Sequence, residues 1–387
     1  MPPSRLLDDD GRQKTEYELT SRRDRQVLEA MLSSNARAVA EHTRHAAFTW
    51  DSVLRLAMQE AVLPAIGWCM HELGCEANIP QEISTFLVEV ERLNAERNEA
   101  IMRETSYAVG LLNEIGICPV LLKGPACIAA GVYPNVGARY MEDADLLIAE
   151  DEIAPALSAL ARHGFVSDTT DPLQAYRHHA PPMQRPASVS IELHHSLVTG
   201  KYASLLPASE VLQSALPCDL GGVNVRVPSP EHLASHVILH SQIRHSYNER
   251  IWPSLRSIFD LVLIDRRFRH QIDWKMIERR FKAAGQHGVF VLYVMQAADE
   301  LGWALPLSPR RGLLLTLRQA RRELLRTVPQ FRFADPIYIA RTALQVRGRT
   351  LSQILGTRHG WRTLLEVLKT RGPYVHVLSD IGRTEKY

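Results

Sequence analysis

Two aspartates, Asp143 and Asp145, lie one residue apart at the start of an apolar segment, "DADLLIA". An apolar run of this length predicts a buried β-strand, and residues two apart on a strand share one face, so both carboxylates point the same way. Ionised carboxylates held side by side near an apolar interior are costly unless a cation joins them. Hard divalent cations bind clustered carboxylate oxygens, so the pair predicts a site for Mg²⁺ or Mn²⁺.

A third carboxylate, Glu192, interrupts another apolar strand segment, "SVSIELHHSL". Strand alternation divides this segment into an apolar face and a polar face, and the polar face carries Ser190, Glu192 and His194. Two metal ions about 3.5–4 Å apart would need such a third acid beside the aspartates. His194 can lie beside the metal ions, contact a substrate or orient the Glu192 carboxylate. The alternative is a set of solvated carboxylates at strand ends, with Glu192 paired to an arginine.

Lys123 and Gly124 end the apolar segment "ICPVLLKG" and open a predicted short helix. A glycine in a strand-to-helix turn lets a phosphate approach the backbone amides and the positive end of the helix. Lys123 would add a positive charge at the same place, although a surface lysine at a strand end is the simpler alternative. Arg139 could bind phosphate oxygens with its planar guanidinium, or it could form an ion pair with Asp143 or Glu142.

Three segments in this order, "LLKG", "RYMEDADLLI" and "IELH", resemble the polymerase-beta-type nucleotidyltransferase superfamily. They are most similar to its largely uncharacterised bacterial branch, which has a KG turn, an R-x-x-x-D-x-D strand and a following E/D-L-H strand. The downstream segments "VPSPEHLASHVILHSQIRH" and "SIFDLVLI" extend the resemblance over about residues 30–300. The resemblance implies that Asp143 and Asp145 are the paired metal ligands, Glu192 the third carboxylate and Gly124 the glycine of the nucleotide-binding turn.

The reaction implied by the resemblance is the transfer of an NMP group from an NTP to an acceptor hydroxyl by a two-metal mechanism. Glu192 would bind a metal ion or act as the general base, and the sequence leaves both roles open. One departure concerns the turn, where the superfamily usually has Gly-Gly or Gly-Ser. Here Lys123-Gly124-Pro125 supplies a cation but lacks one amide and the hydroxyl. The way in which a triphosphate would bind is therefore left open.

The acceptor has three candidates. A hydroxyl on a small molecule or biosynthetic intermediate is favoured. RNA, in particular a tRNA end, comes second, because residues 310–387 carry sixteen Lys and Arg against five Asp and Glu; the alternative for this region is a solvated basic surface. A protein side chain comes third. A catalytically silent module that only binds a nucleotide is a function of another class, and three converging acids argue against it.

Several histidines lie outside these motifs. His232, His236 and His240 recur every four residues on a predicted helix, so they share a face on which zinc is conceivable. No cysteine or carboxylate completes a known zinc motif there, which favours helix packing or lining of the acceptor cleft. His240 and His194 are thus the two histidines proposed to contact the acceptor or support the site. His178 and His179 lie on a predicted loop near the strands, where they could touch substrate.

Arg256 and Asp260 lie one helical turn apart in "SLRSIFDLVLI", which predicts an ion pair within the helix. The resemblance makes Asp260 a candidate structural anchor of the helical region. Trp252 and Trp274 are expected to pack between helices.

The alternation of elements predicts four regions. Residues 1–22 form a polar N-terminus, and residues 23–115 have the three- and four-residue apolar spacing of helices. Residues 116–228 alternate short strands and helices and form the predicted catalytic core. Residues 229–387 are again helical and become basic toward their end. The expected fold is of the α+β class: a polymerase-beta-like α/β core with a mixed sheet, flanked by N-terminal helices and a C-terminal helical domain.

Composition places further bounds on the chain. Its 387 residues are 45% hydrophobic with a formal net charge of +2, so a sizeable core can form and disorder is not expected. The five cysteines form no CxxC pair, which argues against a disulfide framework and a zinc knuckle. No apolar run approaches about eighteen residues, and the N-terminus lacks the apolar core of a signal peptide. The sequence thus predicts a cytoplasmic protein with no membrane partner, and it leaves the oligomeric state open.

Overall fold

The structure, a computed structural model, describes residues 22–44, 48–73, 79–167, 178–198, 200–244, 254–304, 307, 316, 317, 320 and 321. The chain divides into two compact units, one of residues 22–249 with 253–311, the other of residues 1–21, 250–252 and 312–387. Everything below concerns the first unit. The predicted polar N-terminus, Trp252 and nearly all of the basic C-terminal region lie outside the described residues.

Five strands form one sheet in the order β3-β2-β1-β5-β4. They are β1 (Val120–Leu121), β2 (Asp143–Leu147), β3 (Ser190–His194), β4 (Leu216–Leu220) and β5 (Val223–Val227). β2 and β3 are parallel, as are β1 and β5, whereas β1–β2 and β4–β5 are antiparallel, so the predicted mixed sheet is confirmed. β4 was not predicted from the sequence. It contains Pro217, which an edge strand tolerates because one side of it needs no ladder hydrogen bonds.

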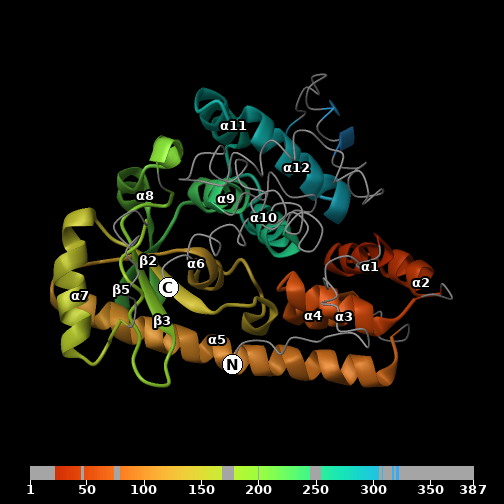
Figure 1. The fold of residues 1–387 in the computed structure, drawn as a ribbon, viewed down its shortest axis with the longest axis horizontal. Coiled ribbons are helices and arrows are strands. Elements are labelled where there is room, and N and C mark those ends of the chain that lie inside the picture. Colours follow the sequence, from red (N-terminus) through yellow and green to blue (C-terminus); the bar gives the residue numbers. More distant parts are fainter. Residues whose placement is uncertain are drawn as a thin grey trace, which may run out of the picture. The chain divides into compact units, whose positions relative to one another are not determined.

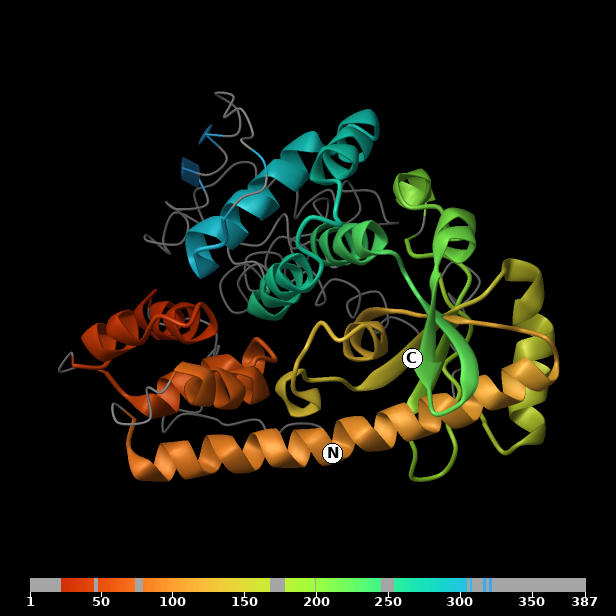
Figure 2. The same ribbon diagram turned by 180° about the vertical axis from the view of Figure 1, so that it is seen from behind.

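A single long helix, α5 (Gln81–Glu114, 34 residues), runs along one side of the sheet in both views (Figure 1, Figure 2). At 1.5 Å per residue it is about 50 Å long. The hydroxyl of Ser106 donates to the carbonyl of Leu220 at 3.0 Å, and the amide of Asn113 donates to the carbonyl of Asn224 at 2.9 Å. These bonds fix α5 to the β4–β5 hairpin. The other N-terminal helices are α1 (Arg22–Leu32), α2 (Ala36–Thr43), α3 (Trp50–Gln59) and α4 (Leu63–Leu73).

Helices also follow the strands. They are α6 (Lys123–Ala129), α7 (Ile153–Arg162), α8 (Ala208–Ser214), α9 (Pro230–Leu239), α10 (Leu255–Arg267), α11 (Trp274–Ala283) and α12 (His287–Leu301). α9 begins where Ser229 caps the amide of His232 and proline occupies the first turn, and it continues as a π-helical segment, His240–Arg244. Among the described helices, none is by itself long and apolar enough to cross a membrane; only α3 and α4, bent by 119°, meet the length and composition together.

The N-terminal helices contact the C-terminal helices directly. Arg25 of α1 is 3% exposed and donates to Glu300 of α12 at 2.7 Å and to Glu29 at 3.1 Å. A buried guanidinium is tolerated only when carboxylates neutralise it, so this cluster fixes where α1 lies on α12. Helices that the sequence assigned to separate flanks of the core therefore pack on each other.

Candidate active site

The parallel pairing of β2 with β3 sets which side chains face each other. Asp143 is opposite Ser190, Asp145 is opposite Glu192 and Leu147 is opposite His194. The alternate side chains of both strands are fully buried in the apolar core: Ala144, Leu146, Ile191 and Leu193. The side chains that could do chemistry thus share the other face, as strand alternation predicts, and this register brings the Asp145 and Glu192 carboxylates together.

Asp145 lies at the centre of the site and is 0% exposed. Its Oδ1 accepts from Lys123 Nζ at 2.6 Å and from His194 Nε2 at 2.6 Å. Burial alone would raise the pKa of Asp145, but the positive charge of Lys123 and the His194 hydrogen bond outweigh it and hold the pKa well below its usual range. The Lys123 ammonium therefore neutralises Asp145 within the protein. The sequence had placed this lysine beside a phosphate and not beside an acid.

The other two acids differ in their environments. Burial and the negative charge of Asp145 raise the pKa of Asp143 to about 6, although Lys123 opposes the shift. Burial would also raise the pKa of Glu192, but the His194 hydrogen bond outweighs it and lowers that pKa. Glu192 remains 19% exposed and lies 3.5 Å from His194 Nε2. The three acids thus compete for limited positive charge, which is the condition that a bound cation relieves.

Three side chains converge closely enough to share one metal ion. Asp145, Glu192 and His194 each offer a ligand atom, and these atoms lie within 4.8 Å of one another. The second carboxylate oxygen of Asp145, Oδ2, is buried and accepts no hydrogen bond from any described residue, so an acceptor is left over for a cation. The residues therefore fit a divalent cation. His194 takes the place in this group that the sequence gave to Asp143.

Next to this group lies an open cavity of about 320 Å³. Asp143 and Glu192 line it, whereas Asp145 and His194 lie behind them. Its other lining residues are Lys123, Gly124, Arg139, Tyr140, Met141, Glu142, His178, His179, His240 and Arg256. Acids from β2 and β3 thus share the cavity with His240 of the π-helical segment after α9 and with Arg256 of α10, so a ligand inside it would touch both the sheet and the helical region.

Arg139 is fixed away from the carboxylates of β2. Its Nε and Nη2 donate to the two carboxylate oxygens of Asp260 in α10, each at 2.9 Å, and both side chains are buried. Tyr133 donates its hydroxyl to the same carboxylate at 2.6 Å. The predicted ion pairs of Arg139 with Asp143 or Glu142, and of Arg256 with Asp260, are not formed between these described residues. Asp260 neutralises the buried guanidinium of Arg139 instead.

The carbonyl of Arg139 is held from the opposite side by α5. The amides of Asn94 and Asn98 donate to this carbonyl at 3.0 and 2.6 Å, and they also donate to the carbonyls of Gly137 and Val136. The sequence did not indicate Asn94 or Asn98, and it made Asp260 a candidate structural anchor without giving Arg139 as its partner. A signal existed for Asp260, since an acid inside the apolar run "IFDLVLI" needs a buried partner as much as Glu192 does.

Gly124 lies where a side chain would not fit. A Cβ atom built on it would lie 2.5 Å from Arg139 Nη1 and 2.5 Å from Met141 Sδ. The preceding residue, Lys123, takes the left-handed backbone conformation, with φ 47°. The glycine of this turn is therefore required because Arg139 and Met141 pack against it.

Replacing Gly124 with alanine should lower the free energy of unfolding by about 1–3 kcal/mol, because overpacking displaces the Arg139 and Met141 side chains. Urea unfolding monitored by circular dichroism measures this change. Gly164→Ala is a useful reference, because no atom lies within 4 Å of a Cβ built there, although its φ of 83° adds backbone strain. A Gly124→Ala protein as stable as the wild type would contradict the packing account.

The histidines are divided between two places. The rings of His178, His179 and His194 lie next to one another, with centroids 4.9–5.2 Å apart. His240 lines the cavity, and with His236 it also lines a smaller adjoining cavity of about 60 Å³. Burial and the charge of Lys123 lower the pKa of His236 to about 3, so it is neutral.

His232, the third member of the predicted stripe, lies apart from the cavity. Its Nδ1 is 3.0 Å from the Ser214 hydroxyl, and its Nε2 is 3.4 Å from Glu210. His240 therefore lines both cavities and His236 the smaller one, whereas His232 packs α9 against α8.

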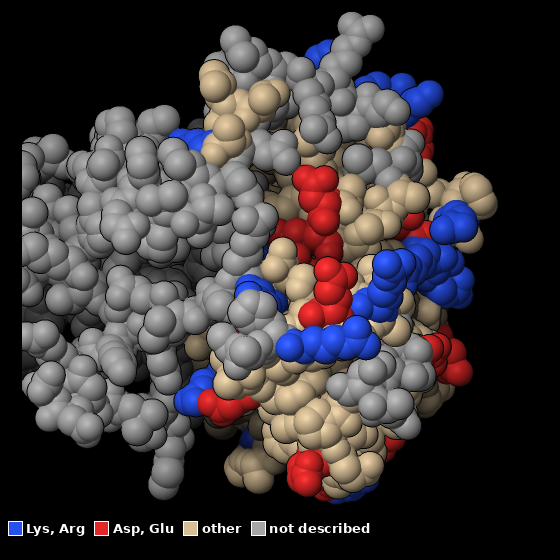
Figure 3. Space-filling model, turned by 90° about the vertical axis from the view of Figure 1, so that its right-hand side faces the viewer, with Lys and Arg blue, Asp and Glu red and all other residues tan. Residues whose placement is uncertain are grey.

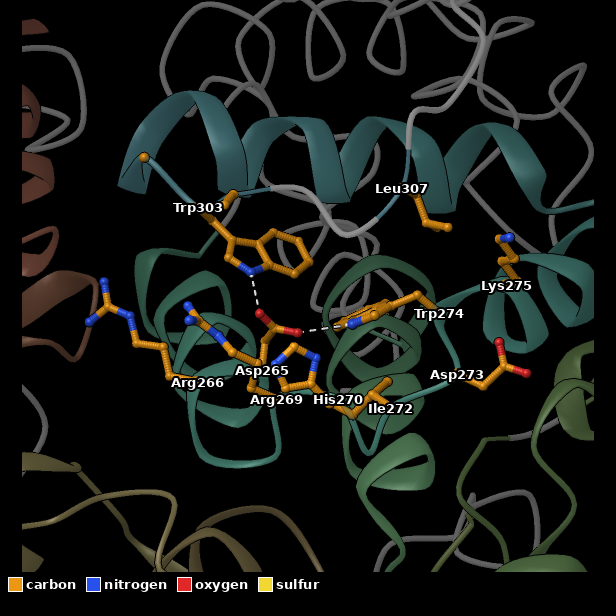
Figure 4. A pocket seen from close by; sticks show the side chains of 12 residues that line it. Asp265, Arg266, Arg269, His270, Ile272, Asp273, Trp274, Lys275, Trp303 and Leu307 are labelled. Carbon is orange, nitrogen blue, oxygen red and sulfur yellow. Dashed lines mark hydrogen bonds between the residues drawn. The ribbon is translucent and has the colours of Figure 1, made fainter.

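A second hollow, of about 710 Å³, lies at the far end of α10 (Figure 4). The indole N–H groups of Trp274 and Trp303 both donate to Asp265, at 2.9 and 2.8 Å (Figure 4). Trp274 is 5% exposed and contacts the Trp303 ring edge to face, as expected for a helix-packing residue. The hollow contains none of the converging acids, so the chemistry of the site belongs to the smaller cavity.

Comparison with known proteins gave two matches. A family model described as "uncharacterised nucleotidyltransferase" matches residues 46–302. Among solved structures, the chain is similar to an antigenic nucleotidyltransferase-like protein from Paracoccidioides brasiliensis, with 17% identity and a TM-score of 0.35 over 54% of this chain and 95% of that one. The sequence identity and the TM-score are too low to transfer any property from that protein to this chain. No curated protein matches the chain.

Proposed function

Because the chain belongs to the family of uncharacterised nucleotidyltransferases, we propose that it transfers an NMP group from an NTP to an acceptor hydroxyl with a divalent metal ion. The observation that carries this proposal is the register of β2 and β3. It sets Asp145 opposite Glu192, with Asp143 and Glu192 exposed to one cavity. Two acids at a cavity, with the buried Asp145 carboxylate between their strands, form an arrangement suited to metal-assisted phosphoryl chemistry.

Each acid has a proposed role. Asp143, Asp145 and Glu192 would hold Mg²⁺ or Mn²⁺, with His194 beside them. A bound divalent ion supplies Lewis-acid stabilisation of phosphate oxygens and lowers the pKa of the acceptor hydroxyl. Glu192 is the acid that both reaches the cavity and has a lowered pKa, so it is ionised and able to accept the hydroxyl proton. His194 keeps the Glu192 and Asp145 carboxylates in place.

We propose a small-molecule hydroxyl as the acceptor. The cavity of about 320 Å³, with its annex of about 60 Å³, has the size of a small-ligand site. On the face that Figure 3 shows, acidic and basic side chains of the described residues lie next to one another. RNA and protein acceptors are the alternatives that an experiment has to separate.

One observation favours a second candidate, a silent nucleotide-binding module. The Lys123 ammonium already neutralises Asp145, as a metal ion otherwise would. Measuring the affinity for each NTP while Mn²⁺ is titrated distinguishes the two candidates. The transferase requires metal-dependent nucleotide binding, whereas nucleotide binding that is insensitive to metal would favour the silent module.

The transferase itself is tested by incubating the protein with each α-³²P-labelled NTP, Mg²⁺ or Mn²⁺, and a cell extract. We expect label in the small-molecule fraction and release of pyrophosphate. Label in RNA or in protein would reassign the acceptor, and absence of label in every fraction with every NTP would contradict transfer. An Asp143→Asn protein in parallel reactions controls for transferases in the extract.

A further inference from the structure

Three cationic side chains line the cavity, and two of them are already neutralised. Lys123 donates to Asp145 at 2.6 Å, and Arg139 donates two bonds to Asp260. Arg256, in the first turn of α10, is partly exposed and lines both the main cavity and its annex. Among the described residues, it forms no hydrogen bond or ion pair. The acid one turn away, Asp260, cannot neutralise Arg256 fully because Arg139 and Tyr133 occupy its oxygens.

The turn that the resemblance assigns to the nucleotide is poorly equipped for a phosphate. Lys123 is engaged with Asp145, and Pro125 has no amide hydrogen. Arg139 and Met141 cover the Cα of Gly124, as the short distances to a Cβ built there indicate. A phosphate approaching from the cavity would therefore find few free donors on this side.

We propose that Arg256 binds the phosphate oxygens of the nucleotide, in the place that the resemblance gives to the Lys123-Gly124 turn. This inference rests on the proposed function. A guanidinium offers a planar fork of donors that matches two phosphate oxygens, and it stays charged at any physiological pH. Arg256 also belongs to the first turn of a 13-residue helix capped by Ser254, whose positive end adds to the attraction for an anion.

The charge distribution of the cavity gives the nucleotide a direction. Asp143 and Glu192, from β2 and β3, and Arg256, from α10, line the same cavity. A metal-bound triphosphate carries positive charge at its metal and net negative charge on its remaining oxygens. The metal end therefore suits the acids and the free oxygens suit Arg256, so that α10 fixes the phosphates while the sheet performs the chemistry.

The test measures equilibrium binding of each NTP and of its nucleoside, with Mg²⁺, by calorimetry. Arg256→Gln should weaken NTP binding by about ten- to a hundredfold, the loss expected for a charge-assisted pair of hydrogen bonds, and leave nucleoside binding unchanged. Arg256→Lys should recover part of the loss, because it restores the charge without the fork. Arg266→Gln is the matched control, because Arg266 is exposed on the same helix and lines the second hollow instead of this cavity; it should bind as the wild type does.

The possible outcomes are distinct. A wild-type protein that binds no NTP would remove both the proposed function and this inference. Wild-type NTP affinity in a folded Arg256→Gln protein would overturn the inference alone. An equal loss of NTP and nucleoside affinity would also overturn it, because the phosphates would not be what Arg256 recognises. Weaker acceptor binding with unchanged NTP binding would overturn it as well, by assigning Arg256 to the acceptor.

Discussion

Replacement of Asp143 by asparagine is expected to lower the rate of nucleotide transfer by about a thousandfold or more while the protein stays folded. Asp143 reaches the cavity, and the ion that it is proposed to hold would lower the activation barrier by several kcal/mol. Replacement of Asp145 is harder to interpret, because it would also leave Lys123 and His194 without their shared carboxylate. Initial rates with the NTP and acceptor of the wild type measure the effect, and full activity would contradict the proposed site.

The same substitution should change the dependence of stability on pH. The pKa of Asp143 is raised to about 6 in the folded protein, so between about pH 4 and pH 6 the folded state binds more protons than the unfolded state does. The contribution of Asp143 therefore makes the wild type less stable as pH rises through this window. The stability of Asp143→Asn relative to wild type should increase from pH 4 to 6 and then level off. An unchanged stability difference between pH 4 and pH 6 would contradict this account of Asp143.

Replacement of Asp260 by alanine should cost about 3–5 kcal/mol of the free energy of unfolding, because it leaves the Arg139 guanidinium buried and unpaired. Tyr133 would lose its acceptor at the same time. Replacing both charges, as in Arg139→Met with Asp260→Leu, should cost much less than the sum of the single changes, because no buried charge then remains. Urea unfolding of the wild type, the two single variants and the double variant measures this coupling.

The exposed ion pair between Arg55 and Asp51 on α3 is the matched reference for that cycle. Pairs in contact with solvent are worth about 0–1 kcal/mol, so Asp51→Ala should have a small effect. If Asp260→Ala were as mild as Asp51→Ala, the contact between the loop before β2 and α10 would not be an important part of the fold.

The sequence predicted the polar face of β2 and β3 because alternation along a strand is a local property. Asp143, Asp145, Glu192 and His194 therefore appear together on that face, as expected. The partners of the cations were not predictable in this way. Lys123 pairs with an acid 22 residues away and Arg139 with one 121 residues away, and nothing in the local pattern selects those partners over nearer acids.

The edge strand β4 also could not be predicted from the local sequence pattern. Its residues are exposed or half-exposed and include Pro217, so the segment has neither an apolar run nor a clean alternation. Pairing with β5 makes it a strand, and that pairing depends on the turn between them rather than on its own residues. The mixed sheet could be predicted, and its full width could not.

The two asparagines of α5 have a practical consequence for work on shortened forms of this protein. A fragment that begins at β1 would contain Asp143, Asp145 and Glu192, and it would look sufficient on the basis of its motifs. It would lack Asn94 and Asn98, whose amides hold the backbone at Arg139. Such a fragment would expose the inner side of the loop that leads into β2. We expect it to be recovered as insoluble material, and a shortened protein should retain α5.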